Sequence, residues 1–147
     1  MRVSAKGEYA LQALLDLARQ GTEGLRPIQE IAARQGIPQR YLEQVLLQLK
    51  RAGFLDSRRG SAGGYRLARP AAEVTVGAVL RAVEGSVAGA EPRRGGRQDR
   101  GDHRGDLVDL WQEVADAVSA VVDGVTIEDL RRRAEDRRAS AHPMYHI

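Results

Sequence analysis

At 147 residues the chain has room for one domain of usual size, or for a small domain with a substantial appendage. It contains no cysteine, which excludes disulfides, thiol nucleophiles and cysteine-ligated metal centres. Aromatic residues are only 4% of the sequence, so the core must be built from Leu, Val, Ile and Ala, which favours packed helices. No apolar run approaches the roughly 18 residues of a membrane span, and no signal-peptide pattern opens the chain. We therefore expect a soluble, cytoplasmic protein with no membrane partner.

Charge is divided unevenly along the sequence. Residues 1–70 hold 12 Lys and Arg against 6 Asp and Glu, a net charge of +6, whereas residues 71–147 hold 11 against 14, a net charge of −3. This asymmetry is typical of a nucleic-acid-binding part joined to a part with another role. The alternative is compositional drift, because 21 of the 23 basic residues are Arg, as a GC-rich genome would encode.

The first third of the chain predicts three helices. Apolar residues recur at steps of three and four over residues 4–20 and again over residues 27–35, and a longer amphipathic pattern covers residues 38–52. Gly36 and the apolar Ile37 form the short turn between the second and third of these helices. This spacing is typical of a helix-turn-helix.

Two short strands follow the third helix. Residues 54–57 and 65–67 predict strands, and the loop between them, residues 58–64, holds three glycines that permit a tight hairpin with positive φ. A connector helix over residues 76–83 is predicted to pack back on this unit. The expected helix caps are Ser4, Thr75 and Thr126. A basic hairpin directly after a helix that can enter a groove indicates a winged helix.

The side chains that would read DNA come from the third helix, the hairpin loop and the amino terminus. Arg40 can donate two hydrogen bonds to guanine, Gln39 or Gln44 can bond adenine, and Glu43 can accept from cytosine. At the hairpin tip Arg59 can enter a narrow minor groove, although a solvated loop arginine is the alternative. The full predicted set is Arg2, Ser4, Lys6, Gln39, Arg40, Tyr41, Glu43, Gln44, Arg58, Arg59 and Gly60.

The second half begins with a change of composition. Residues 85–105 hold six Gly and five Arg with almost no apolar residue, which indicates a flexible loop, or alternatively a second basic arm on DNA. From residue 106 to residue 123 an apolar seam follows heptad spacing, wider than one small domain needs to cover, so we predict a homodimer interface. Packing of this helix on its own domain alone is the alternative. The predicted interface residues are Leu107, Leu110, Trp111, Val114, Val118 and Val121.

These motifs resemble a known family. Lys6-Gly7 with Tyr9, the string YLEQ at residues 41–44 and the string RGSAGGY at residues 59–65 are similar to the DNA-binding domain of the Rrf2 family of bacterial regulators, the group of IscR and CymR. The resemblance covers residues 1–69 and continues weakly beyond them. It implies that the third helix and the wing bind a palindromic operator as a homodimer held by a long carboxyl-terminal helix.

One departure from the family matters. Its iron–sulfur members carry three cysteines in the loop that here spans residues 85–105, and this chain has none. Glu8 and His103 lie near places where some members supply other ligands, but two such ligands without thiolate cannot hold a cluster. We therefore predict no cofactor, no metal and no thiol redox sensing, and a closer likeness to the cysteine-metabolism repressors of the family.

The carboxyl terminus resembles the tail of those repressors, which act with the cysteine-synthesis enzyme O-acetylserine thiol-lyase. A flexible peptide with an apolar last residue and a free carboxylate can occupy a pocket built for an amino acid. Tyr145, His146 and Ile147 are therefore predicted to bind that enzyme, with Ile147 as the anchor. A frayed tail is the alternative.

We predict a mainly α fold with a small β-hairpin wing, namely a winged helix-turn-helix with a connector helix (1–84), a flexible loop (85–105), dimerisation helices (106–138) and a tail (139–147). The predicted function is repression of cysteine or sulfur metabolism genes. Alternatives are a cluster-free regulator of other genes that responds to a small ligand, and a winged helix that binds proteins only. An enzyme is not expected, because the three histidines lie in flexible segments with no partner to orient them and no cysteine is available.

Overall fold

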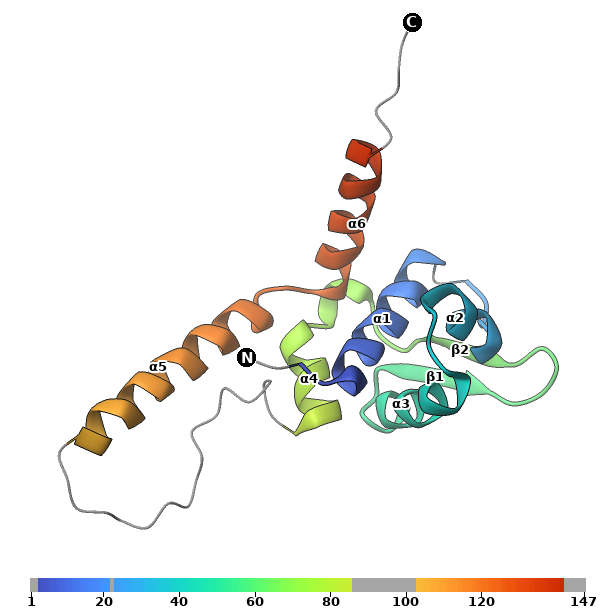
Figure 1. The fold of residues 1–147 in the computed structure, drawn as a ribbon. Helices are drawn as coiled ribbons and strands as arrows, with labels where there is room; N and C mark the ends of the chain where they lie inside the picture. The colour runs from blue at the N-terminus through green and yellow to red at the C-terminus, as the bar shows by residue number, and fades with distance from the viewer. Residues whose placement is uncertain (1–2, 22, 86–102, 142–147) are drawn as a thin grey trace, which may run out of the picture.

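The computed structural model describes residues 3–21, 23–85 and 103–141, which form a compact body with two projecting helices (Figure 1). The elements in chain order are α1 (Ala5–Arg19), α2 (Ile28–Gln35), α3 (Gln39–Arg51), β1 (Leu55–Arg58), β2 (Gly64–Leu67), the short 3-10 helix η1 (Ala71–Glu73), α4 (Val76–Glu84), α5 (His103–Asp123) and α6 (Ile127–Ala141). The predicted mainly α winged-helix fold is confirmed. No helix within the described ranges is long and apolar enough to cross a membrane.

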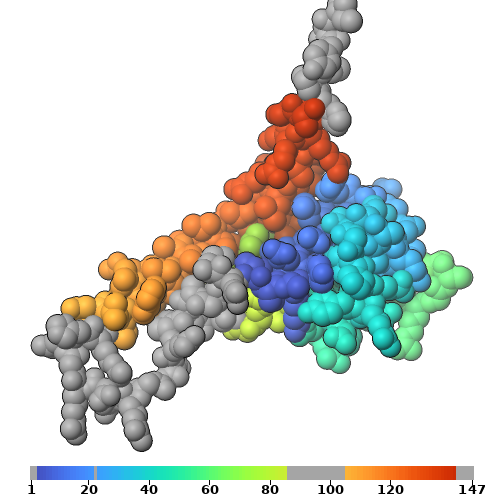
Figure 2. Space-filling view, in the orientation of Figure 1, coloured from blue at the N-terminus to red at the C-terminus, as the bar shows by residue number. Residues whose placement is uncertain are grey.

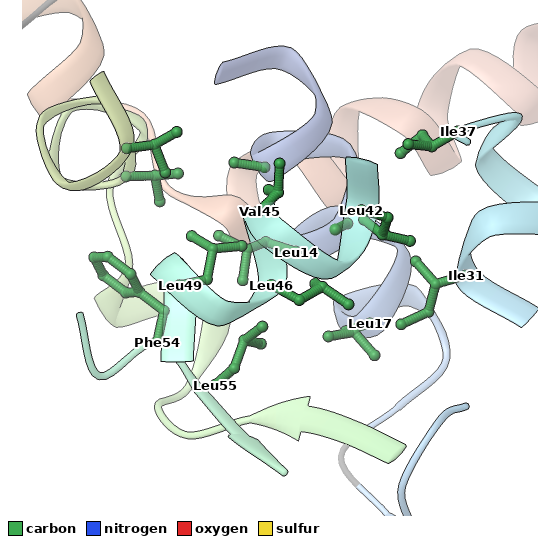
Figure 3. Packing of buried hydrophobic residues seen from close by; sticks show 14 of the residues in the cluster. Leu14, Leu17, Ile31, Ile37, Leu42, Val45, Leu46, Leu49, Phe54 and Leu55 are labelled. Atoms are coloured by element: carbon green, nitrogen blue, oxygen red, sulfur yellow. The ribbon is translucent and has the colours of Figure 1, made fainter. Parts of the chain in front are cut away.

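The body is built around α3, whose inward stripe is completely buried. Leu42, Val45, Leu46 and Leu49 are at most 1% exposed, as the helical periodicity predicts. Figure 3 shows these side chains packed among residues of α1, α2 and β1. Ile37, in the turn before α3, is 4% exposed and fills the angle between α2 and α3, so its predicted role is also confirmed.

The wing is a two-stranded antiparallel hairpin. Its paired residues are Leu55 with Leu67, Asp56 with Arg66, Ser57 with Tyr65 and Arg58 with Gly64. Tyr65 also exchanges two backbone hydrogen bonds of 2.8 Å with Arg26, just before α2. A Cβ at Gly64 would overlap the carbonyl of Arg26, and Gly64 has a φ of +148°. Only glycine therefore allows the returning strand to lie this close to the segment before α2.

The predicted helix caps are present. The Ser4 hydroxyl accepts a hydrogen bond from the Gly7 N–H, and the Thr75 hydroxyl accepts one from the Ala78 N–H. A reciprocal pair closes the start of α6: the Asp129 N–H donates to the Thr126 hydroxyl and the Thr126 N–H donates to the Asp129 carboxylate. These bonds satisfy donors that a helix end leaves open, and they lower the pKa of Asp129 below its usual value.

An ion pair with a buried carboxylate joins the first two helices. Asp16 of α1 is 2% exposed and accepts two hydrogen bonds of 2.9 Å from the Arg34 guanidinium of α2. Gln35 adds a third bond of 3.2 Å to the same carboxylate. The hydrogen bond with Asp16 raises the pKa of Arg34. A bidentate pair has a narrow preferred geometry, so these contacts hold α2, and with it the turn into α3, at a defined position on α1.

The carboxyl-terminal helices attach to the body in two places. The start of α6 packs on α1, with Ile127 completely buried and its N–H donating to the Val74 carbonyl, and the end of α5 is joined to α4. Arg81 of α4 donates two hydrogen bonds, of 2.6 and 2.9 Å, to Asp123 at the end of α5. A Cβ at Gly77 would overlap that carboxylate, so the absence of a side chain there lets α4 and α5 approach closely. Beyond this junction α5 extends away from the body, and α6 projects in another direction (Figures 1 and 2).

The predicted elements of the body are placed within about one residue, and the two outer boundaries of the carboxyl-terminal helices differ by three. Helix α5 begins at His103 instead of residue 106, and α6 continues to Ala141 instead of ending at residue 138. The added residues are His-Arg-Gly at the start of α5 and Ala-Ser-Ala at the end of α6, and neither set includes a large apolar residue that would extend the periodicity from which the boundaries were predicted. Most of the predicted flexible loop, residues 86–102, lies outside the described residues.

Candidate nucleic-acid interface

The surface of α3 opposite its buried stripe carries the predicted base-reading residues. Gln39, Arg40, Glu43 and Gln44 are all exposed, whereas the buried residues of the helix face α1. Arg40 and Gln44 lie four residues apart, so their side chains are neighbours on one face. On this face Arg40 and Gln44 can donate hydrogen bonds to base edges and Glu43 can accept one. No other described element covers these side chains.

Tyr41 has a second role that its position in the sequence does not indicate. Its ring meets the ring of Tyr9 of α1 edge to face, with centroids 5.4 Å apart and planes at 82°. Such aromatic pairs contribute about 0.5 to 1.5 kcal/mol beyond burial. Tyr41 is still 39% exposed, so the contact with α1 orients a ring that remains accessible at the edge of the candidate interface.

The hairpin loop displays the predicted arginines. Arg58, Arg59 and Gly60 are exposed, and Gly60 has the positive φ of +107° that the glycine pattern predicts. The Gly63 N–H donates to the Gly60 carbonyl at 3.0 Å, and a Cβ at Gly63 would overlap the Arg58 carbonyl. The glycines therefore make a narrow tip, which projects from the body in Figures 1 and 2.

Residues of the amino terminus are arranged differently from the prediction. The Ser4 hydroxyl, besides accepting from Gly7, donates to the Glu84 carboxylate, and the Ser4 N–H donates to the same oxygen at 3.1 Å. An acidic side chain from the end of α4 thus occupies the position predicted for a phosphate. A phosphate contact by Ser4 requires displacement of Glu84. Lys6 is partly exposed and available, and Arg2 lies outside the described residues.

The cations of this surface are not neutralised by nearby carboxylates. Within the described residues, Arg40, Arg58 and Arg59 form no ion pair, whereas Arg34, Arg81 and Arg131 on other surfaces each bind one or more carboxylates. Lys50 also lines a shallow cleft with Arg58 and Arg66 beside the hairpin, where Arg66 is the exception because it pairs with Asp56 at 3.7 Å. Lys50 and Arg66 were not among the predicted DNA-contacting residues, although both line the same cleft as Arg58, which was. The unpaired arginines lie on α3 and on the hairpin, and a negatively charged phosphate backbone would be attracted to them.

Comparison with known proteins establishes the family. The sequence matches the Rrf2 family model, described as "Iron-dependent Transcriptional regulator", over residues 3–133. The chain belongs to the Rrf2 family. It is 38% identical to the HTH-type transcriptional regulator IscR of Serratia proteamaculans over 130 residues, which are 88% of this chain and 79% of that one. It is a DNA-binding transcriptional regulator, as its relatives are.

Two solved structures are similar over most of their length. The structure of CymR (YrzC), the global cysteine regulator of B. subtilis, has a TM-score of 0.74 and 31% identity, and the match covers 90% of this chain and 98% of that one. The IscR of T. potens has a TM-score of 0.74 and 34% identity, with 93% and 90% covered. The winged-helix fold of this chain is therefore shared with regulators of both names.

The iron dependence in the family description does not fit the donor set of this chain. Iron–sulfur clusters are held by cysteine thiolates, and the sequence has no cysteine. Among residues 3–21, 23–85 and 103–141, no three His, Asp or Glu side chains gather closely enough to hold a metal ion. The residues present therefore do not provide an iron–sulfur site.

The predicted dimer residues lie on the projecting part of α5. Leu107, Leu110, Trp111, Val114 and Val121 are between 39% and 66% exposed. The helix instead contacts its own chain through Ala115 and Val122, which are buried, and through Val118, which packs partly on Leu80. Val118 is itself a predicted interface residue, so packing on the same chain covers part of the predicted seam and leaves the other five residues exposed. Tyr145, His146 and Ile147 lie outside the described residues.

Proposed function

We propose that this protein is a homodimeric regulator that binds a palindromic DNA operator. The observation that carries the proposal is the exposed outward face of α3 beside an arginine-bearing hairpin, with no ion pair on Arg40, Arg58 or Arg59 among the described residues. In this arrangement α3 lies in the major groove and the hairpin reaches the adjacent minor groove. Arg59 would be attracted to a narrow minor groove, where the negative potential is strongest.

Sequence preference would come from three side chains of α3. We assign Arg40 to a guanine, Gln44 to an adenine and Glu43 to a cytosine, because these pairings match donors to acceptors. Each good pairing discriminates against other bases by about 1 to 3 kcal/mol. Two or three such contacts are enough to specify a half-site.

The homodimer would form through the uncovered apolar face of α5. A helix of 21 residues spans about 31 Å at about 1.5 Å per residue, long enough for several turns of contact with a second copy. A two-fold axis there would place two α3 helices in successive major grooves, about 34 to 36 Å apart. The operator would then be palindromic, with half-sites one helical turn apart or a multiple of it.

The finer proposal is repression of cysteine or sulfur metabolism genes together with O-acetylserine thiol-lyase. It is supported by the structural likeness to CymR, a global cysteine regulator, and by the lack of cysteine ligands. The second candidate is a cluster-free regulator of other genes that responds to a small ligand. The 38% identity to IscR of Serratia proteamaculans favours that broader possibility.

Selection of bound duplexes from a random DNA library by the full chain tests the DNA proposal. We expect a palindromic consensus, and binding that weakens steeply as salt rises because counterions are released. Enrichment of no sequence, with salt-insensitive binding, would contradict it. For the partner, deletion of residues 145–147 should abolish association with the thiol-lyase, and unchanged association would overturn that part of the proposal.

A further inference from the structure

One apolar side chain lies on the outward face of α3. Leu47 is 45% exposed, whereas the four buried apolar residues of the same helix are at most 1% exposed, and it packs in neither hydrophobic cluster of the body. Single exposed leucines are common on protein surfaces and are not by themselves evidence of a site. The position of Leu47 relative to the candidate base-reading residues is what distinguishes it.

Leu47 shares a stripe with the predicted base-reading residues. It follows Glu43 by four residues and Gln44 by three, so all three side chains are neighbours on the helix surface. It follows Arg40 by seven residues, which is within about 20° of two complete turns. The side chain therefore points in nearly the same direction as Arg40, one turn further along α3 than Gln44.

The surroundings of Leu47 indicate a nucleic acid as the occupant. Arg51 follows it by four residues and is exposed, and Arg40 and Lys50 are also exposed on this helix. A protein partner with an apolar surface would have to desolvate these cations, whereas DNA would neutralise them. In the major groove the thymine C5 methyl is the apolar group that base edges present.

We propose that Leu47 contacts the C5 methyl group of a thymine in the major groove and so reads one T·A pair in each half-site. The inference rests on the proposed function, since it requires α3 to lie in that groove. It adds a base position to those assigned to Arg40, Glu43 and Gln44, whose polar ends read the hydrogen-bonding groups of bases. Leu47 is thus a specificity-determining residue.

Thymine and deoxyuridine differ only by this methyl group, so their comparison isolates the contact. In the duplex selected by the full chain, each thymine of one half-site is replaced in turn by deoxyuridine. At one position the wild-type protein should lose affinity about fourfold, the factor for burial of one methyl-sized group. Leu47→Ala should bind both duplexes equally at that position, and Leu47→Met, which keeps an apolar side chain of similar volume, should retain the difference.

Arg51→Ala is the matched control, because Arg51 lies on the same face one turn on. It should weaken binding to both duplexes equally and leave the thymine-to-deoxyuridine ratio at about fourfold. The inference is overturned if no thymine in the half-site is methyl-sensitive, or if Leu47→Ala keeps the wild-type ratio everywhere. If the wild-type chain selects no sequence at all, the proposed DNA-reading function fails first and this inference fails with it.

Discussion

Helices α3 and α5 distribute their apolar residues in opposite ways. On α3 the apolar stripe is buried against α1 and the polar residues face outward, with Leu47 as the exception. On α5 the described apolar side chains are mainly outward, and only Ala115 and Val122 are buried against the same chain. A polar, cationic face suits a polyanion, whereas a broad apolar face suits a protein surface. The contrast indicates two different partners, DNA for α3 and a second copy for α5.

The largest expected effect comes from α5. Trp111→Asp places a charge in the middle of the uncovered apolar face, so the two copies should separate. A separated copy can bind only one half-site at a time, so affinity for a palindromic duplex should fall by at least about 100-fold. Affinity for a single half-site should change little. Sedimentation velocity and parallel DNA titrations measure the two effects.

Ala120→Asp is the matched control on α5, because Ala120 is exposed but lies away from the predicted seam. It adds the same charge to the same helix and should leave both the dimer and operator affinity unchanged. If both variants behave alike, the apolar face of α5 is not the interface.

The next effect concerns the body. Gly64→Ala adds a Cβ that overlaps the Arg26 carbonyl at a backbone with φ of +148°, so it should destabilise the hairpin by about 2 to 3 kcal/mol. Operator affinity should fall while the α5 dimer persists, as thermal unfolding and sedimentation would show. Gly24→Ala is the control, since Gly24 also has positive φ but nothing lies within 4 Å of an added Cβ. Equal losses in both variants would mean that backbone strain, and not the contact with Arg26, is responsible.

A single reading residue should have a smaller and more local effect. Arg40→Ala should cost about 1 to 3 kcal/mol at one base position, with relaxed preference there and unchanged preference elsewhere. Titrations against duplexes changed at each position of the half-site measure this. Arg137→Ala on α6 removes the same charge far along the chain and should leave the base preferences intact. A uniform loss across all sequences would reassign Arg40 to phosphate contact.

The smallest expected effect is on pH dependence at the junction between α4 and α5. The hydrogen bonds from Arg81 lower the pKa of Asp123 below its usual value of about 3.9, so the contact stabilises the folded state above that value. Stability is lost as pH falls through the lowered pKa and Asp123 becomes protonated. Asp123→Asn should lower the melting temperature at pH 7. Below pH about 4 the melting temperature of the variant should fall less than that of the wild-type protein. If the melting temperature of the variant depends on pH as that of the wild-type protein does, the ion pair of Asp123 does not stabilise this junction.

Local patterns in the sequence predicted most of the body correctly. The buried stripe of α3 follows from helical periodicity, and the caps at Ser4, Thr75 and Thr126 follow from side chains that bond donors three residues away. The spacing of the glycines predicted the hairpin, because a tight turn needs residues that adopt positive φ readily, as Gly60 does here. These features need no knowledge of distant residues.

Contacts between distant residues were not predicted, and they changed the candidate site. Glu84 reaches Ser4 across 80 positions, and Tyr9 meets Tyr41 from another helix, so neither contact leaves a local pattern. Leu47 was not predicted for a different reason: base edges present mainly hydrogen-bonding groups, so an apolar side chain on the outward face of a helix gives no sign of base contact. Its 45% exposure, and its absence from both hydrophobic clusters, are properties of the folded chain.

The stoichiometry of the complex tests the central contrast most directly. Sedimentation velocity of the full chain with its selected palindromic duplex measures how many chains bind each duplex. Two chains per duplex, reduced to a weakly bound single chain by Trp111→Asp, is the predicted result. One chain per duplex in the wild-type protein, with unchanged affinity in that variant, would contradict the assignment of α3 to DNA and α5 to a second copy.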